Sequence, residues 1–131
     1  MRTLIAEDDF VCRVLLQQLL TPYGQTDVAV DGAEAVMAVK AAYADGRPYD
    51  LLCLDIMMPE MDGQAVLREV RDLEESNGII YSRGMKIIMT TALDDPPNVF
   101  QAFQSLCDGY LTKPIYKEKL IAELKKMGLI K

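Results

Sequence analysis

Carboxylates are the most prominent residues of this sequence that could carry out chemistry. Glu7, Asp8 and Asp9 are consecutive, and Asp55 follows the apolar run Leu51–Leu54. Both groups come directly after segments that are predicted to be strands, so we expect them to meet at one edge of a sheet. Converging carboxylates repel one another unless a cation lies among them. Because oxygen ligands with few protein donors favour Mg²⁺, the sequence predicts a magnesium site.

Two further polar side chains are expected at the same edge. Thr91 follows the apolar segment that begins at Lys86, and Lys113 follows the short segment that begins at Gly109. A hydroxyl and an ammonium beside such a site suit phosphoryl transfer, because the charge on the phosphoryl oxygens has to be balanced. In this interpretation Asp55 is the nucleophile and forms an aspartyl phosphate, while Lys113 and Thr91 contact the phosphoryl oxygens.

The elements that would position these residues alternate between strands and helices. This alternation predicts an α/β fold, a doubly wound five-stranded parallel sheet with helices on both faces, because each parallel pairing needs a right-handed crossover. In the flavodoxin-like order 2-1-3-4-5, ligands bind at the carboxyl ends of the strands, between strands one and three. The predicted strands are 3–6, 27–30, 51–54, 86–90 and 109–111, and apolar residues at helical spacing predict helices over 11–19, 31–44, 64–73, 94–106 and 120–127.

Length and composition fit one globular domain over residues 1–131. The 131 residues suffice for one hydrophobic core, and 50% of them are hydrophobic while 26% are charged. Apolar segments are too short for a membrane span or a signal peptide, so we expect a cytoplasmic protein that does not bind membranes. Cys12, Cys53 and Cys107 lack a metal-binding or redox spacing and are expected to be buried free thiols.

Charge and residue types exclude several classes of function. A formal net charge of −6 disfavours direct nucleic-acid binding, which needs a positively charged surface. The sequence contains no histidine, which excludes histidine-based triads, most zinc sites and a histidine phosphocarrier role for this chain.

The motifs at the expected strand ends resemble those of a known family. They are the acidic cluster at Glu7, the pattern D-x-x-M-P-x-M-D-G over Asp55–Gly63, Thr91-Ala92, and Lys113-Pro114 three residues after Tyr110. Each motif alone is weak, but four in order, each at the end of a strand, are specific. Over essentially its whole length, the chain resembles the receiver domain of two-component response regulators, the family of the single-domain chemotaxis regulator.

The resemblance implies a role for each matching residue. Asp55 matches the phosphoacceptor, Lys113 matches the lysine that contacts the phosphoryl group, and Thr91 matches the switch hydroxyl. Tyr110 matches the aromatic residue that turns inward when this hydroxyl moves. The backbone carbonyl of Met57 matches the third protein ligand of Mg²⁺.

The acidic cluster offers two registers for the metal ligands. Family members place an arginine or a similar polar residue five positions after the second acid, and Arg13 stands there if the pair is Glu7 and Asp8. We therefore expect Asp8 to bind the metal directly and Glu7 to act through a water. Asp9 is the alternative acid; otherwise it caps the first helix.

Thr90 competes with Thr91 for the role of the switch hydroxyl. Strand alternation would point one of them inward and the other toward the site. The family pattern of a threonine followed directly by an alanine selects Thr91.

The resemblance implies phosphorelay signalling and no turnover of an external substrate. Asp55 would accept a phosphoryl group from a sensor histidine kinase or a histidine phosphotransfer protein. The phosphoryl group would then switch the face formed by the helix over 94–106, the strand over 109–111 and the last helix, and that face would bind a downstream protein. We expect no output domain within residues 1–131.

Three rival functions use similar residues or topology. An aspartate-nucleophile, Mg²⁺-dependent phosphatase would carry a second acid two positions after the nucleophile, where Met57 stands. A nucleotide- or flavin-binding module would need a glycine-containing turn in place of Glu7-Asp8-Asp9. The complete set of site residues disfavours a degenerate receiver that binds partners without phosphate.

Overall fold

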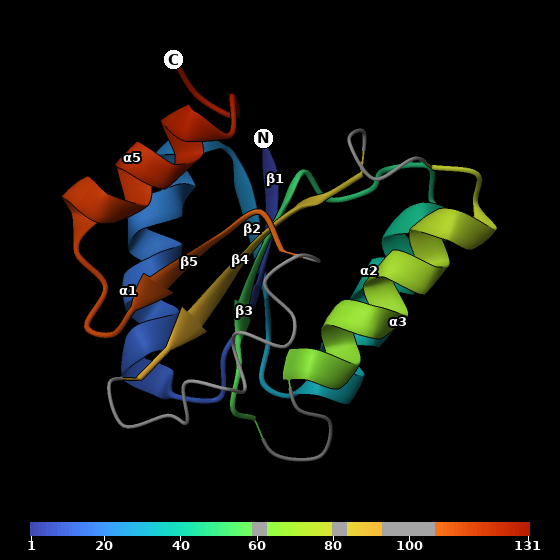
Figure 1. Ribbon diagram of the computed structural model, residues 1–131, viewed down its shortest axis with the longest axis horizontal. Coiled ribbons are helices and arrows are strands. Elements are labelled where there is room, and N and C mark those ends of the chain that lie inside the picture. The colour runs from blue at the N-terminus through green and yellow to red at the C-terminus, as the bar shows by residue number, and fades with distance from the viewer. Residues whose placement is uncertain (59–62, 80–83, 93–106) are drawn as a thin grey trace.

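The chain forms a parallel sheet with helices on both faces, as the alternating pattern predicts. The computed structural model describes residues 1–58, 63–79, 84–92 and 107–131. In this part of the chain the sheet has five strands in the predicted order β2-β1-β3-β4-β5 (Figure 1). The strands are β1 (Arg2–Ala6), β2 (Gln25–Ala29), β3 (Leu51–Asp55), β4 (Lys86–Thr91) and β5 (Gly109–Thr112).

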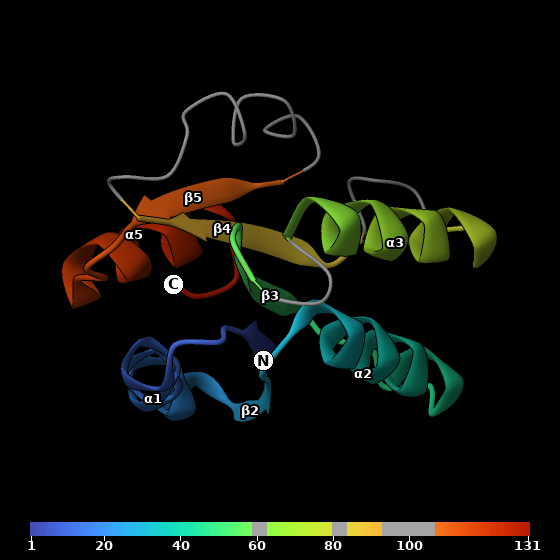
Figure 2. The ribbon, with the colours of Figure 1, turned by 90° about the horizontal axis from the view of Figure 1, so that it is seen from below.

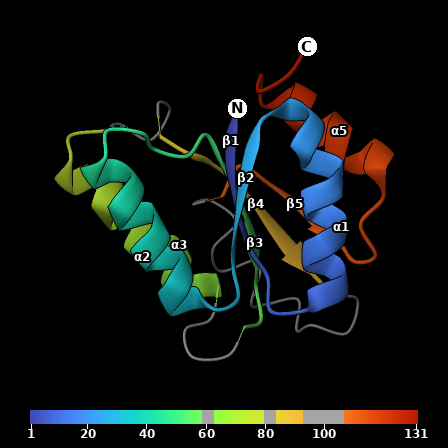
Figure 3. The same ribbon diagram turned by 180° about the vertical axis from the view of Figure 1, so that it is seen from behind.

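The described helices form two layers, one on each face of the sheet. They are α1 (Phe10–Leu20), α2 (Gly32–Ala44), α3 (Gly63–Ser76) and α5 (Lys117–Lys126), with a 3₁₀ turn η1 (Thr21–Tyr23) after α1. Helices α1 and α5 cover one face, and α2 and α3 cover the other (Figure 2), an arrangement also visible from behind in Figure 3. The helix predicted over 94–106 and the Pro59–Asp62 part of the motif lie outside the described residues.

The central strand β3 is buried along its whole length, as its apolar sequence predicts. Its side chains alternate between two hydrophobic cores, although its sequence shows no alternation of polarity. Leu52 and Leu54 belong to the core beneath α2 and α3, whereas Leu51 and Cys53 belong to the core beneath α1 and α5. β3 is therefore a central strand covered on both faces, and its last residue, Asp55, lies at the carboxyl ends of the strands.

Each strand differs from its predicted range by one or two residues at an end, and pairing explains the differences that matter for the site. β2 begins at Gln25, two residues before the predicted start, because it pairs with the whole of β1 and its edge position tolerates polar residues. Asp55 and Thr91 are the last residues of β3 and β4 and do not lie beyond them. Pairing continues that far because Asp55 lies opposite Thr90 and the Ile56 amide donates to the Thr90 carbonyl at 3.0 Å.

A buried charge cluster ties α3 to β4 and to the start of β5. Arg71 donates to Glu74 at 2.5 Å, to the Met85 carbonyl at 3.0 Å and to Asp108 at 3.1 Å. Glu74 also accepts from the Met85 amide at 2.7 Å, and Asp108 accepts from the Ile87 amide at 2.8 Å. These bonds hold β4 at its amino end, the end of the sheet opposite the carboxylates.

Replacing Glu74 with glutamine should lower the free energy of unfolding by about 3 kcal/mol, because the amide cannot accept from both of its buried donors and removes one of the two carboxylates, Glu74 and Asp108, that pair with Arg71. The neighbouring exposed Glu75 offers a matched control, and Glu75→Gln should change stability by less than about 0.5 kcal/mol. Urea unfolding of both variants measures the difference. Equal effects at the two positions would show that the cluster contributes no more than a surface charge.

Candidate functional site

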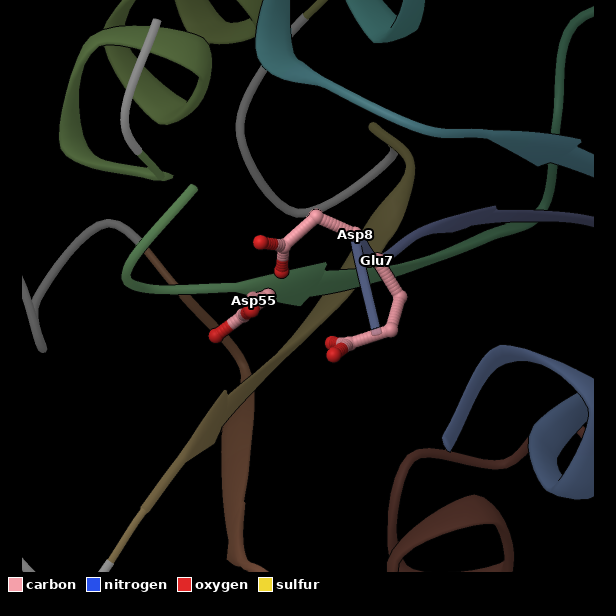
Figure 4. A group of neighbouring side chains, drawn as sticks. All are labelled: Glu7, Asp8 and Asp55. Carbon is pink, nitrogen blue, oxygen red and sulfur yellow. The ribbon is translucent and has the colours of Figure 1, made fainter. Parts of the chain in front are cut away.

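Three of the predicted acidic side chains lie together at the carboxyl ends of β1 and β3. Glu7 and Asp8 follow β1, and Asp55 ends β3. One carboxylate oxygen from each of the three lies within 4.8 Å of the others. Figure 4 shows their carboxylates turned toward a shared space. The adjacent pairing of β1 and β3 produces this acidic group from residues that are almost fifty positions apart.

Asp9 lies outside this acidic group and caps helix α1. Its carboxylate accepts a hydrogen bond from the Cys12 amide at 3.2 Å. Arg13 donates to the backbone carbonyls of Glu7 and Asp8 at 2.9 and 3.4 Å and so fixes the turn that carries both acids. This arrangement favours the register in which Glu7 and Asp8 form the pair.

Lys113 reaches the acidic group from the end of β5. Its Nζ lies 2.7 Å from Glu7 Oε1 and 3.4 Å from Asp55 Oδ2. The predicted role of Lys113 concerns only the phosphoryl group, and the structure adds a short ion pair with Glu7. The two residues are 106 positions apart, so no local sequence signal links them.

Burial controls the protonation of this site. Burial together with the charge of Glu7 raises the pKa of Asp55 to about 7, although Lys113 opposes the shift. Burial also raises the pKa of Glu7 in spite of its hydrogen bond to Lys113. For Lys113, burial would lower the pKa, but the hydrogen bond from its ammonium to Glu7 and the charge of Asp55 outweigh burial and raise it.

The donor set fits a divalent cation that prefers oxygen ligands. Glu7 is fully buried, and its Oε2 has no hydrogen-bond partner among the described residues. A buried carboxylate oxygen without a partner is costly, and a cation among the three carboxylates would compensate its charge. Met57, whose carbonyl is the other predicted ligand, directly follows the first residue after β3, and its amide donates to Asp55 Oδ1 at 3.2 Å. Mg²⁺ fits this set of donors.

The remaining predicted residues lie on β4 and β5. Thr91 is half-buried at the end of β4, and its hydroxyl donates to the Ala92 carbonyl at 3.2 Å. Thr90 is 1% exposed, and its hydroxyl has no partner within the described ranges. Tyr110 is 50% exposed on β5. The roles of Thr91 and Tyr110 stay predictions.

Comparisons with known proteins find relatives that share this sequence pattern. The model of the family described as response regulator receiver domain matches residues 3–125. The regulatory protein VanRB of Enterococcus faecalis is 31% identical over 131 residues, which cover 97% of this chain and 53% of that protein. The hybrid signal transduction histidine kinase L of Dictyostelium discoideum is 32% identical over 133 residues, which cover 97% of this chain and 7% of that protein. The chain thus spans about half, or far less, of the length of these relatives.

Solved structures share the fold as well. The CheY-like response regulator receiver domain protein of Methanospirillum hungatei is 27% identical, with a TM-score of 0.72 and coverage of 98% of this chain and 94% of that chain. A receiver domain of Saccharomyces cerevisiae, crystallised with a histidine phosphotransfer signalling protein, is 26% identical, with a TM-score of 0.79 and coverage of 98% and 89%. In the part of this chain that the structure describes, the helices are too short or too polar to cross a membrane.

The acidic group predicts different effects for neighbouring acids. Adding Mg²⁺ should raise the unfolding midpoint of the wild type and of Asp9→Asn, because a ligand that binds only the folded state stabilises it. The midpoint of Asp8→Asn should respond only at much higher Mg²⁺ concentration. Without metal, Asp9→Asn should keep the stability of the wild type to within about 0.5 kcal/mol, because asparagine caps a helix about as well as aspartate does. An unchanged Mg²⁺ response in Asp8→Asn, with a lost response in Asp9→Asn, would favour the other register.

The raised pKa of Asp55 predicts a stability that falls with increasing pH. Between about pH 4 and 7 the folded protein keeps a proton on Asp55 that the unfolded chain has lost, so the free energy of unfolding should fall over this range. The loss should be about 4 kcal/mol without divalent cations, because the pKa of Asp55 rises from 3.8 to about 7 and each unit corresponds to about 1.4 kcal/mol; Glu7 acts in the same direction. Lys113 adds nothing here because it titrates at alkaline pH. Urea unfolding at a series of pH values measures this. Asp55→Asn should flatten the dependence of the free energy of unfolding on pH, whereas the exposed Asp72→Asn should leave it unchanged. If Asp55→Asn and the wild type show the same pH dependence, the pKa of Asp55 is not raised.

Proposed function

The chain belongs to the response regulator receiver domain family of two-component signalling, and from this premise we propose that Asp55 accepts a phosphoryl group in the presence of Mg²⁺. The donor would be a phosphohistidine on a sensor histidine kinase or a histidine phosphotransfer protein. The observation that carries this proposal is the position of Asp55 beside the Glu7 and Asp8 carboxylates and 3.4 Å from the Lys113 ammonium. The yeast receiver crystallised with a phosphotransfer protein supports the class of donor.

The chemical step needs an ionised Asp55. Its carboxylate oxygen attacks phosphorus, an O–P bond forms as the N–P bond of the phosphohistidine breaks, and the leaving imidazole takes up a proton. The Met57 amide holds Oδ1 at 3.2 Å and orients the carboxylate, while Lys113 compensates charge near Oδ2. Asp8, Asp55 and the Met57 carbonyl would hold Mg²⁺, with Glu7 acting through a water, and the ion would supply positive charge against the phosphoryl oxygens.

Output would follow from a rearrangement of β4 and β5. In the proposed switch the Thr91 hydroxyl leaves the Ala92 carbonyl, donates to a phosphoryl oxygen, and allows Tyr110 to turn inward. Tyr110 is half-exposed in the structure, which is the outward position from which such a turn would start. A downstream protein would read the new surface of β5 and α5, because phosphorylation biases an equilibrium between two conformations of that face.

The start of α1 supports docking of the phosphodonor protein. Phe10 and Val11 are 67% and 72% exposed although both are apolar, and they stand two to three residues after Asp8. A partner that covers them would exclude water from the acyl phosphate as it forms. A pocket of about 430 Å³ lies beside them and is lined by Asp9, Val11, Cys12, Leu15, Lys113, Pro114 and Ile115.

The phosphatase alternative is less well supported by the residues around Asp55. An aspartate-nucleophile phosphatase needs an acid two positions after the nucleophile to protonate the leaving group and activate water. Met57 stands there and has no proton to transfer. We therefore propose a phosphoacceptor that acts in the cytoplasm, in keeping with three buried cysteines that form no disulfide, and that turns over no external phosphoester.

Intact mass spectrometry tests the proposed function directly. The wild-type chain, incubated with Mg²⁺ and a small acyl-phosphate donor, should gain the mass of one phosphoryl group. Asp55→Asn should gain none, while the exposed Asp72→Asn should behave as the wild type. A wild type that gains no phosphoryl group, or a gain that survives Asp55→Asn, would overturn the assignment.

A further inference from the structure

Thr90 occupies a position beside Asp55 on the same side of the sheet. The register of β3 and β4 places the two residues opposite each other, and paired residues of neighbouring strands point to the same face. Two positions earlier, Cys53 and Ile88 are paired in the same way and belong to the core beneath α1 and α5. Thr90 therefore faces the side of the sheet from which Lys113 approaches Asp55.

The Lys113 side chain has to pass the end of β4 to reach the acidic group. Lys113 directly follows β5, yet its Nζ lies 3.4 Å from Asp55 on β3, and β4 lies between these two strands. The side chain thus crosses the strand end that carries Thr90. Thr90 itself is 1% exposed although it lies one residue from the end of its strand.

The Thr90 hydroxyl is unfavourable in the resting site. Within the described residues it is buried without a hydrogen-bond partner, a state that costs stability and that valine of nearly the same shape would avoid. Glu7 Oε2, on the other side of Asp55, is buried without a partner in the same way. Both oxygens lie along the path of one ammonium group, whose Nζ now contacts Glu7 Oε1 and Asp55 Oδ2.

Phosphorylation changes the balance of charge around that ammonium. A phosphoryl group on Asp55 adds negative charge at β3, and a cation beside Glu7 competes with Lys113 for the Glu7 carboxylate. Both effects draw the Lys113 ammonium from Glu7 toward Asp55 and Thr90. An ammonium has three donors, so one remains for a neighbouring hydroxyl after the phosphoryl oxygens are contacted.

We propose that Thr90 is a further positioning residue of this site, whose hydroxyl accepts a hydrogen bond from Lys113 once a phosphoryl group on Asp55 has drawn the ammonium away from Glu7. This inference rests on the proposed function. Thr90 acts through Lys113 and is distinct from Thr91, whose hydroxyl is the proposed switch. In the resting protein the buried Thr90 hydroxyl lowers stability, and in the phosphorylated protein it accepts a hydrogen bond from Lys113.

Two substitutions separate the hydroxyl of Thr90 from its methyl group. Thr90→Val keeps the shape and removes the hydroxyl, so the urea midpoint of the resting protein should rise. Its phosphorylation by a small acyl-phosphate donor at saturating Mg²⁺ should slow about tenfold, the expected effect of losing one hydrogen bond to a charged group. Thr90→Ser keeps the hydroxyl and leaves a small cavity, so its midpoint should fall while its rate stays within about twofold of the wild type.

Thr26 provides the matched control, because its hydroxyl accepts from Gln17 at 3.2 Å, away from the acidic group. Thr26→Val should lower the midpoint and leave the rate unchanged. A Thr90→Val protein that is less stable, or that is phosphorylated at the wild-type rate, overturns the inference, as does a Thr90→Ser protein that is equally slow. If the wild type gains a phosphoryl group and these variants match it, only the inference fails; if the wild type gains none, the proposed function fails with it.

Discussion

The architecture at the carboxyl edge depends on the ion pair between Glu7 and Lys113. The sheet brings three carboxylates within 4.8 Å of one another, and two of them are buried, a grouping that repels itself in the absence of a positive charge. Lys113 supplies that charge at 2.7 Å from Glu7. Because Lys113 follows β5 and Glu7 follows β1, the ion pair also connects the first and last of four neighbouring strands at their carboxyl ends.

The fold was predictable because its signals are local and repeated. Short, mostly apolar segments of three to five residues alternate with segments whose apolar residues have helical spacing, and parallel pairing leaves few topologies open. The errors lie where pairing overrides composition: β2 includes the polar Gln25 because β1 provides a complete partner, and Asp55 ends its strand because Thr90 lies opposite. The meeting of Glu7, Asp8 and Asp55 followed from strand ends. The Lys113–Glu7 pair did not, since it depends on how far one side chain reaches across two strands.

The two ends of β4 have different physical characters. At the amino end, Arg71 and Asp108 connect the strand to α3 and to β5 through hydrogen bonds whose partners are all within the protein. At the carboxyl end, the Thr90 hydroxyl is buried without a partner in the described part of the chain, and so is Glu7 Oε2 on the other side of Asp55. A well-satisfied network resists rearrangement, and an unsatisfied one gains from it. The amino end of β4 is thus held by satisfied hydrogen bonds, whereas a rearrangement at its carboxyl end could supply a partner for a buried hydroxyl.

Because the pKa of Asp55 is raised to about 7, the acidic group binds a proton part of the time at neutral pH. Near pH 7 this carboxyl is about half protonated, so a cation that binds there has to release part of a proton to the solvent. The apparent affinity for the cation therefore rises with pH. Cation binding in a weakly buffered solution should lower the pH of that solution. Through this exchange of one positive charge for another, cation binding at the site would be coupled to the acidity of its surroundings, and so would the phosphoryl transfer proposed above.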